Sequence, residues 1–355
     1  MNTFFPPLST KNNNNKKRKQ PNHRQQPQQN QPIQPQQPIQ QPIQPIPPEP
    51  KETKPKPEQP QRPANSYNLP DLPPETCQLI ADLADVEKRF NALHQLSVIA
   101  DKHQDLAIPL WYSYGTVVIL LDEIVSVYPY ISGKHKETLS VSSYSLIQRV
   151  CKALALLQTI ASHQKTQHFL ISIDIIYFLT PIFALTQVER EIEFLRLTSL
   201  GVIGAMAKTR DPEIIKYLMD KEVLMICIVS IQHAAEISRV IATFILSKLF
   251  TENIALENVC ETPQKITSIA NLLCHSIANT LLSKRENVNT RLVRYSLECL
   301  HRLSTNSRAV PQLTSLANEY RSLFKDTLFD YTANKDTTIK PKYDEFCKNI
   351  NFSPK

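Results

Sequence analysis

From about residue 73 onward, apolar side chains recur along the chain with the period of an α-helix. In residues 149–170 the apolar positions are Val150, Leu154, Leu157 and Ile160, which fall on one helix face before a polar break. The repeating unit consists of a basic residue, an apolar helix of about four turns that follows it, and a short polar loop at the end of the helix. It recurs at residues 196–219, 239–259 and 291–313, with a weaker copy at residues 89–110.

The opening arginines give this repeat its period, because they lie 60, 47, 43 and 52 residues apart, with an irregular insert at residues 129–143 in the long first interval. These spacings bracket the period of armadillo and HEAT repeats. No helix group of this size buries its apolar face alone, so neighbouring repeats must stack. The sequence predicts an all-α fold, an armadillo-type right-handed superhelical solenoid over residues 71–340, with a C-terminal extension at 341–355.

Prolines support this division into helices. Each of them is expected at or near a segment start, where a missing N–H costs least; they are Pro109, Pro181, Pro212, Pro263 and Pro311. Asp211 before Pro212 has the pattern of an N-cap followed by proline at the first helical position. Residues 169–185 are strongly apolar but too short and interrupted for a membrane span, and they predict a buried helix that turns at Thr180 and Pro181.

The prolines and charges of the chain separate into two regions. Nineteen of the 27 prolines lie in residues 1–74, and residues 1–70 hold 10 Lys/Arg against 3 Asp/Glu, which leaves 30 basic and 30 acidic residues in the rest. The Gln/Pro/Asn-rich composition predicts a disordered tail over residues 1–70. Its basic run at residues 16–19 suits nuclear import or nucleic-acid binding as well as simple solvation. Without a signal-peptide pattern, we expect the protein in the cytoplasm and nucleus.

The sequence offers no recognisable catalytic apparatus. Four glycines include no phosphate-binding loop, and the seven cysteines form no CxxC pair, so reduced core cysteines are expected. His163 and His168 bring no third ligand at metal spacing. The acidic group Glu189, Glu191 and Glu193 is typical of a solvated helix start. We therefore predict no enzyme, no cofactor and no metal.

Two features invite a binding function. Residues 110–130 carry the only tryptophan and a group of tyrosines, which suit a helical core and also an interaction surface. Gly201 and Gly204 lie within a strongly apolar helix, where glycine costs about 1 kcal/mol relative to alanine. Either they leave a shallow trough for a bound helix or peptide, or another helix packs closely there.

Several blocks of the chain strongly resemble the Rcd-one/Caf-forty family, which supplies the armadillo-type subunit of the Ccr/Not mRNA deadenylase complex. The blocks are residues 111–116 (WYSYGT), 149–158 (RVCKALALLQ), 194–205 (FLRLTSLGVIGA) and 242–246 (ATFIL), with further agreement at 308–309 and 335–338. The resemblance runs from about residue 72 to about 336 and leaves out the tail. It implies a non-catalytic adaptor for mRNA decay and translational repression.

The resemblance also implies three binding sites. The helix that docks on the Not-one scaffold would present Tyr112, Tyr114, Val118 and Val125. A concave groove for helical or extended motifs of RNA-associated regulators would present Phe194, Gly201 and Ile241. Animal relatives carry tryptophan-binding pockets on the convex side; the matching positions here are Pro263, Lys265 and Arg308, where an aromatic residue and an arginine are expected at the first two.

An alternative function is a nucleic-acid-binding transcription cofactor in differentiation, which the basic tail and the family's nuclear associations favour. The zero net charge of residues 71–355 favours protein partners over nucleic acid. A locally uneven distribution of charge, and with it weak nucleic-acid binding, is left open. A homodimer is likewise left open, and no membrane partner is expected.

Overall fold

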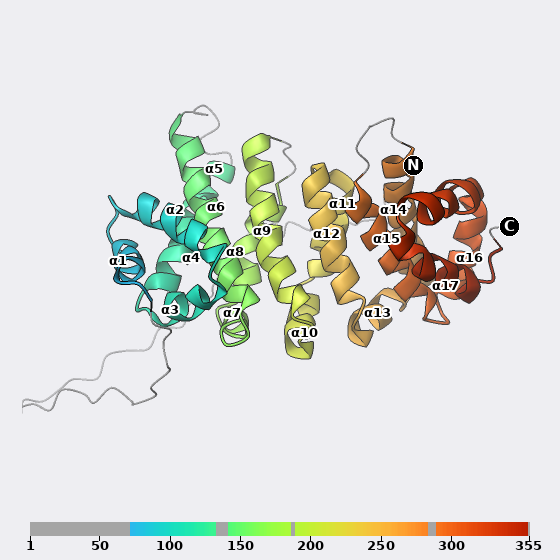
Figure 1. Ribbon diagram of the computed structural model, residues 1–355, viewed down its shortest axis with the longest axis horizontal. Coiled ribbons are helices and arrows are strands. Elements are labelled where there is room, and N and C mark those ends of the chain that lie inside the picture. The colour runs from blue at the N-terminus through green and yellow to red at the C-terminus, as the bar shows by residue number, and fades with distance from the viewer. Residues whose placement is uncertain (1–71, 133–140, 186–188, 283–288, 354–355) are drawn as a thin grey trace, which may run out of the picture. The chain divides into compact units, whose positions relative to one another are not determined.

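The computed structural model describes residues 72–132, 141–185, 189–282 and 289–353 (Figure 1). The expectations for the tail therefore lie outside the described residues, as does most of the predicted insert. Within the described ranges every regular element is a helix and no strand occurs, which confirms the predicted all-α class.

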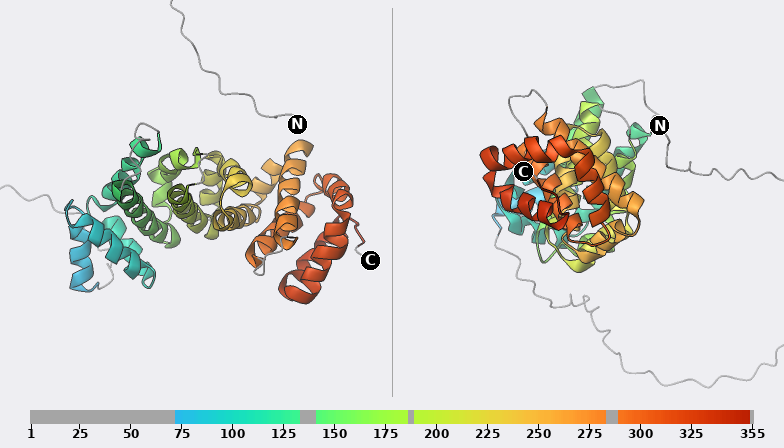
Figure 2. Two further views of the ribbon diagram at one scale, coloured as in Figure 1. Left: turned by 90° about the horizontal axis from the view of Figure 1, so that it is seen from above. Right: turned by 90° about the vertical axis from the view of Figure 1, so that its right-hand side faces the viewer.

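One row of helices runs through these residues, each helix packed against the next (Figure 1). Figure 2 shows the same succession from above. The row consists of α2 (Arg89–Ala100), α6 (Val141–Ser162), α9 (Arg190–Lys208), α12 (Glu236–Leu249), α15 (Thr290–Ser304) and α17 (Lys340–Asn349). This is the repeating stack that the sequence period predicts.

A second set of helices packs against the members of this row. It consists of α1 (Pro74–Asp82), α4 (Thr116–Ser126), α8 (Ile175–Phe183), α11 (Val223–His233), α14 (Pro263–Leu281) and α16 (Val310–Glu319). Shorter helices connect them: α3 (Ala107–Tyr112), α5 (Tyr128–Ile131), α7 (Phe169–Ser172), α10 (Pro212–Asp220) and α13 (Asn253–Val259). In Figure 1, α3, α7, α10 and α13 follow one another along the lower edge of the row.

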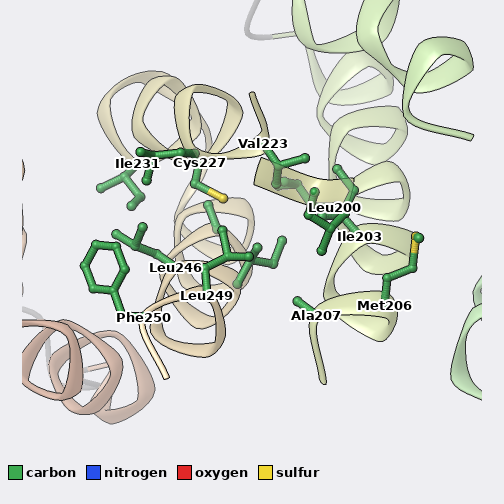
Figure 3. Packing of buried hydrophobic residues seen from close by; sticks show 14 of the residues in the cluster. Leu200, Ile203, Met206, Ala207, Val223, Cys227, Ile231, Leu246, Leu249 and Phe250 are labelled. Atoms are coloured by element: carbon green, nitrogen blue, oxygen red, sulfur yellow. The ribbon is translucent and has the colours of Figure 1, made fainter. Parts of the chain in front are cut away.

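A single apolar cluster joins the repeats from Ile80 to Phe352. Figure 3 shows its middle, where Leu200 of α9, Cys227 of α11 and Leu246 of α12 point toward a common interior. All three are fully buried. Since a fully buried leucine contributes about 1.5–3 kcal/mol, such contacts between neighbouring repeats hold the stack together.

Two of the arginines that mark the repeats in the sequence hold neighbouring segments together. The Arg89 Nε donates to the carbonyl of Leu83 at 2.8 Å, and Arg196 Nη2 donates to the carbonyl of Leu185 at 2.8 Å. Each arginine therefore ties its helix to the segment before it. These contacts do not define helix starts: α6 begins at Val141, well before Arg149.

Helix ends confirm one expectation and correct another. Asp211 caps α10, because its Oδ1 accepts from the backbone N–H of Glu213 at 2.9 Å. Pro181, in contrast, lies inside α8, so the predicted turn at Thr180 and Pro181 is wrong. The break comes earlier, between α7 and α8, where Asp174 adopts a left-handed backbone conformation with φ 51°.

The remaining segments differ from the expectation in detail. Of the predicted insert, Pro129 lies in α5, and the last three residues form the start of α6. Residues assigned to the C-terminal extension form α17, which packs on α15 and buries Phe346 and Cys347. Among the described residues, no helix combines the length and the hydropathy needed to cross a bilayer.

Candidate protein-docking surfaces

The first surface surrounds the turn from α3 into α4. Gly115 caps α4 with φ 79°, a left-handed conformation that glycine adopts without steric cost, and Tyr114 before it is fully exposed. Val118 and Val125 lie seven residues apart on α4 and are 69% and 38% exposed. Because seven residues make about two helical turns, both side chains lie on one side of α4. We call Tyr114, Val118 and Val125 the α4 surface.

Tyr112, the fourth residue expected there, is only half-buried and belongs to a neighbouring aromatic cluster. Its ring stands edge-on to Phe169 of α7, with the centroids 6.1 Å apart. Trp111 stacks on the same ring of Phe169, with the centroids 4.6 Å apart. Sequence reasoning missed Phe169, because it lies more than 50 residues beyond Tyr112 and only stacking of the repeats brings them together.

The second surface is the open side of three neighbouring row helices. Since α6 and α12 flank α9, and α8 and α10 pack against it as well, only one side of α9 is left uncovered. The predicted Phe194 lies there and is 41% exposed, while Ile241 on α12 is half-buried. Tyr144 on α6 and Ile237 on α12 are 50% and 63% exposed. We call this side, with Tyr144, Phe194, Ile237 and Ile241, the α6–α9–α12 face.

The register of the three helices is fixed by polar contacts between them. Thr198 on α9 donates to the Sγ of Cys151 on α6 at 3.6 Å. On the other side, Glu193 Oε2 accepts from the backbone N–H of Ala235 at 2.9 Å and from the hydroxyl of Ser238 at 3.3 Å. Glu193 also pairs with Arg196. The expectation that Glu193 belongs to a solvated acidic helix start is therefore wrong, since it fastens α9 to α12.

Both helical glycines are in close contact with neighbouring helices. A Cβ on Gly204, which is buried, would lie 3.6 Å from Ile245 on α12. A Cβ on Gly201 would lie 2.5 Å from the side-chain oxygen of Gln158 on α6. Of the two alternatives left open by the sequence, close packing within the chain is the one observed. The predicted groove residue Gly201 thus lies beneath a flexible amide rather than in an open trough.

Cationic side chains accompany the apolar ones on the α6–α9–α12 face. The guanidinium of Arg190 lies 5.5 Å from the ring centre of Phe194, and the ammonium of Lys248 lies 5.2 Å from that of Phe244. Lys152 is half-buried on α6. Among the described residues, no carboxylate forms an ion pair with Lys152, Arg190 or Lys248. The starts of α9 and α12 also carry Glu189, Glu191 and Glu236, so charges of both signs border this face.

The third expected site looks different from the pocket that the resemblance implies. Pro263 is the first residue of α14 and is exposed. Lys265 Nζ forms an ion pair with Glu261 Oε2 at 2.6 Å and donates to the carbonyl of Asn258 at 3.4 Å. Arg308 is exposed. Lys265, which is paired with Glu261, thus occupies the position where the resemblance implies an arginine.

One group of potential metal ligands occurs in the described part of the chain: His168, Asp211 and Glu213. His168 Nε2 lies 3.0 Å from Asp211 Oδ2, and its Nδ1 lies 3.4 Å from Glu213 Oε2. Sequence spacing missed this group, because His168 and Asp211 are 43 residues apart. Each ring nitrogen already faces a carboxylate, so the contacts of His168 with Asp211 and Glu213 account for the arrangement.

The thiols do not resemble reactive nucleophiles. All seven cysteines are free; five are buried, Cys151 is half-buried and Cys77 is exposed. Burial raises the pKa of Cys227 and of Cys151, and it raises the pKa of Cys347 to about 11. Since the thiolate is the reactive form, these side chains stay protonated and inert at neutral pH.

Comparison with known proteins agrees with this architecture. The family model "Cell differentiation family, Rcd1-like" matches residues 79–350. Cell differentiation protein rcd1 of Schizosaccharomyces pombe is 35% identical over 237 residues, which cover 67% of this chain and 80% of that protein. Protein CAF40 of Saccharomyces cerevisiae is 33% identical over 236 residues, covering 66% of this chain and 61% of that protein, so less than two thirds of CAF40 is matched.

Two of the solved structures that share this fold are designed armadillo repeat proteins. One, in complex with the peptide (KR)4, gives a TM-score of 0.53 at 16% identity and covers 78% of this chain and 100% of its own. Another gives 0.54 at 14% identity, covering 77% and 99%. At such identities the likeness concerns the fold alone, and it confirms the predicted armadillo-type stack.

Proposed function

Because the chain belongs to the Rcd1-like cell differentiation family, we propose that it is a non-catalytic adaptor subunit of the Ccr/Not deadenylase complex. In this role it docks on the Not-one scaffold and presents regulators of RNA to the complex, in the cytoplasm and the nucleus. A regulator docked on the adaptor raises the effective concentration of the deadenylase at one transcript. This mechanism needs only binding surfaces, and it promotes deadenylation, decay and translational repression.

The observation that carries the proposal is the α4 surface. Tyr114, Val118 and Val125 expose apolar area on a helix that the fold itself leaves uncovered on this side. Tyrosine is one of the residue types that supply most of the binding energy at protein interfaces, and neighbouring apolar contacts exclude water around it. Tyr112, two residues before Tyr114, contacts the ring of Phe169, on which Trp111 stacks.

The test is co-purification of the full chain with the Not-one scaffold. Tyr114→Ala combined with Val118→Asp is expected to abolish co-purification, because it removes one anchor and places a charge in the desolvated contact. Lys216→Ala, an exposed change on α10 away from this surface, is the control. Far-UV circular dichroism and thermal unfolding confirm that each variant is folded. Undiminished co-purification of the folded double variant would refute the assignment of this surface.

A further inference from the structure

We propose that residues 65–71, the chain directly before α1, lie across α2 and complete the first repeat by covering Phe90 and Val98. We call these two side chains the α2 patch. The inference concerns the N-terminal end of the stack and goes beyond the adaptor function. It rests on the exposure of the α2 patch, on the contrast with the other end of the stack, and on the apolar residues that precede α1.

The α2 patch lies on the first helix of the row. Since α1 and α6 pack against α2, and no earlier repeat stands beside it in the described chain, one side of α2 is open. Phe90 and Val98 are 43% and 45% exposed. They are eight residues apart, which places them about 80° from each other on this open side. Between them Gln95 donates to the side-chain oxygen of Asn91 at 3.1 Å. These two polar side chains bond to each other, whereas the apolar ones are left in contact with water.

The other end of the stack looks different. The last helix of the row, α17, buries Tyr343 and Phe346, and it exposes Asp344, Glu345 and Lys348. Terminal repeats of a helical array need such a polar outer face, because no further repeat covers them. Among the described residues the C-terminal end has this face, and α2 at the N-terminal end combines polar side chains with the α2 patch. The N-terminal end is therefore the one that needs a further cover.

The chain directly before α1 has suitable side chains for this cover. Tyr67 is the first aromatic residue after Phe5, and Leu69 is the first leucine after Leu8. Leu72, three residues further on, already packs against the core. Leu69 and Leu72 each precede a proline, which favours an extended backbone at both positions. In an extended chain, side chains two residues apart point to the same side, so Tyr67 and Leu69 can contact α2 together.

The length of chain fits the distance to be covered. Tyr67 is five residues before Leu72, which allows a reach of about 17 Å, and α2 with its 12 residues is about 18 Å long. Because the connection is short, it keeps the segment at a high effective concentration next to α2. This favours residues 65–71 over a second copy of the chain. It also favours them over Phe4 and Phe5, since closing a much longer loop costs more entropy.

Hydrogen exchange of the full chain tests the proposal. Tyr67→Ser combined with Leu69→Ser is expected to make the amides of α2 exchange at least about tenfold faster, because the helix loses its cover. The amides of α12, in the middle of the row, should be unaffected. Phe4→Ser combined with Phe5→Ser is the matched control, because it removes two apolar side chains from the far end of the tail. It should leave the exchange of α2 unchanged.

A second pair of substitutions locates the contact. Phe90→Ser combined with Val98→Ser removes the α2 patch itself. If residues 65–71 contact this patch, adding the changes at Tyr67 and Leu69 to this variant should speed the exchange of α2 by less than about twofold more. Effects that multiply fully would show that the two groups of residues do not touch. Far-UV circular dichroism confirms that each variant is folded.

Three results would overturn the proposal. The first is unchanged exchange of α2 when Tyr67 and Leu69 are replaced. The second is a dimer, measured by light scattering, that the changes at Phe90 and Val98 convert into a monomer, since a second copy would then cover α2. The third is loss of the Not-one scaffold from the folded Phe90 and Val98 variant, which would assign α2 to that partner. The Tyr67 and Leu69 variant should still co-purify with the scaffold, so failure of this inference leaves the adaptor function standing.

Discussion

Glu123 offers the sharpest test of how the first repeats are held together. Its side chain is 2% exposed and lies between two arginines: Arg89 Nη1 at 3.2 Å and Arg149 Nε at 2.6 Å. The three residues come from α4, α2 and α6, so a single carboxylate joins three helices. The α4 surface is carried by the same helix.

The expected magnitudes follow from burial. Removing one partner of a buried ion pair costs about 3–5 kcal/mol, because it leaves an uncompensated buried charge. For Glu123→Ala we expect about that loss, since the Arg89 side chain is only 15% exposed and cannot recover water. Arg149 is 34% exposed, so Arg149→Ala should cost less, about 1–2 kcal/mol. Glu123→Gln keeps the shape and one acceptor, and should fall between them.

The assay is urea unfolding of the full chain, read by circular dichroism, with hydrogen exchange of α2, α4 and α6 as a local readout. Hydrogen exchange is needed because stacked repeats can unfold in parts rather than in one step. Asp122→Ala, an exposed neighbour, is the control and should change stability by less than about 0.5 kcal/mol. If Glu123→Ala costs no more than Asp122→Ala, the triad does not stabilise the fold and this reasoning fails.

Two further predictions concern the interior. Gly204→Ala should raise the free energy of unfolding by up to about 1 kcal/mol, because its Cβ meets α12 at ordinary contact distance. Gly201→Ala should raise it less, because its Cβ meets the side chain of Gln158, and combining Gly201→Ala with Gln158→Ala should remove this shortfall. Thermal unfolding measures all of these changes. In native protein at pH 8, a thiol reagent should modify Cys77 rapidly and Cys347 only on unfolding, since the pKa of Cys347 is raised to about 11 by burial; rapid modification of several thiols would contradict this.

The sequence predicted those features that depend on local pattern. The helical period and its repeat gave the armadillo-type stack, and Asp211 before Pro212 gave a correct helix start, because a cap needs only neighbouring residues. Pro181 was misjudged for the opposite reason: burial of the apolar residues around it keeps α8 helical, although proline has no N–H to donate to the preceding turn. Tertiary packing decided that helix, and no local signal reports it.

The candidate sites were predictable only in part. The family resemblance pointed to Val118 and Phe194, both of which are exposed, but Tyr144 and Ile237 were missed. An apolar residue on a covered helix side and one on an open side look alike in a sequence, since both follow the helical period. Glu193 was misread because its partners on α12 lie more than 40 residues away.

Basic residues have two different roles in this fold. Repeat arginines such as Arg89 and Arg196 donate hydrogen bonds to backbone carbonyls and pair with carboxylates inside the stack. The cations of the α6–α9–α12 face, such as Arg190 and Lys248, stand outside the repeat register and have no such partners among the described residues. Net charge counts both kinds equally, whereas a partner meets only the second. Exposure and pairing, rather than the charge balance of the sequence, therefore decide which charges a binding partner meets.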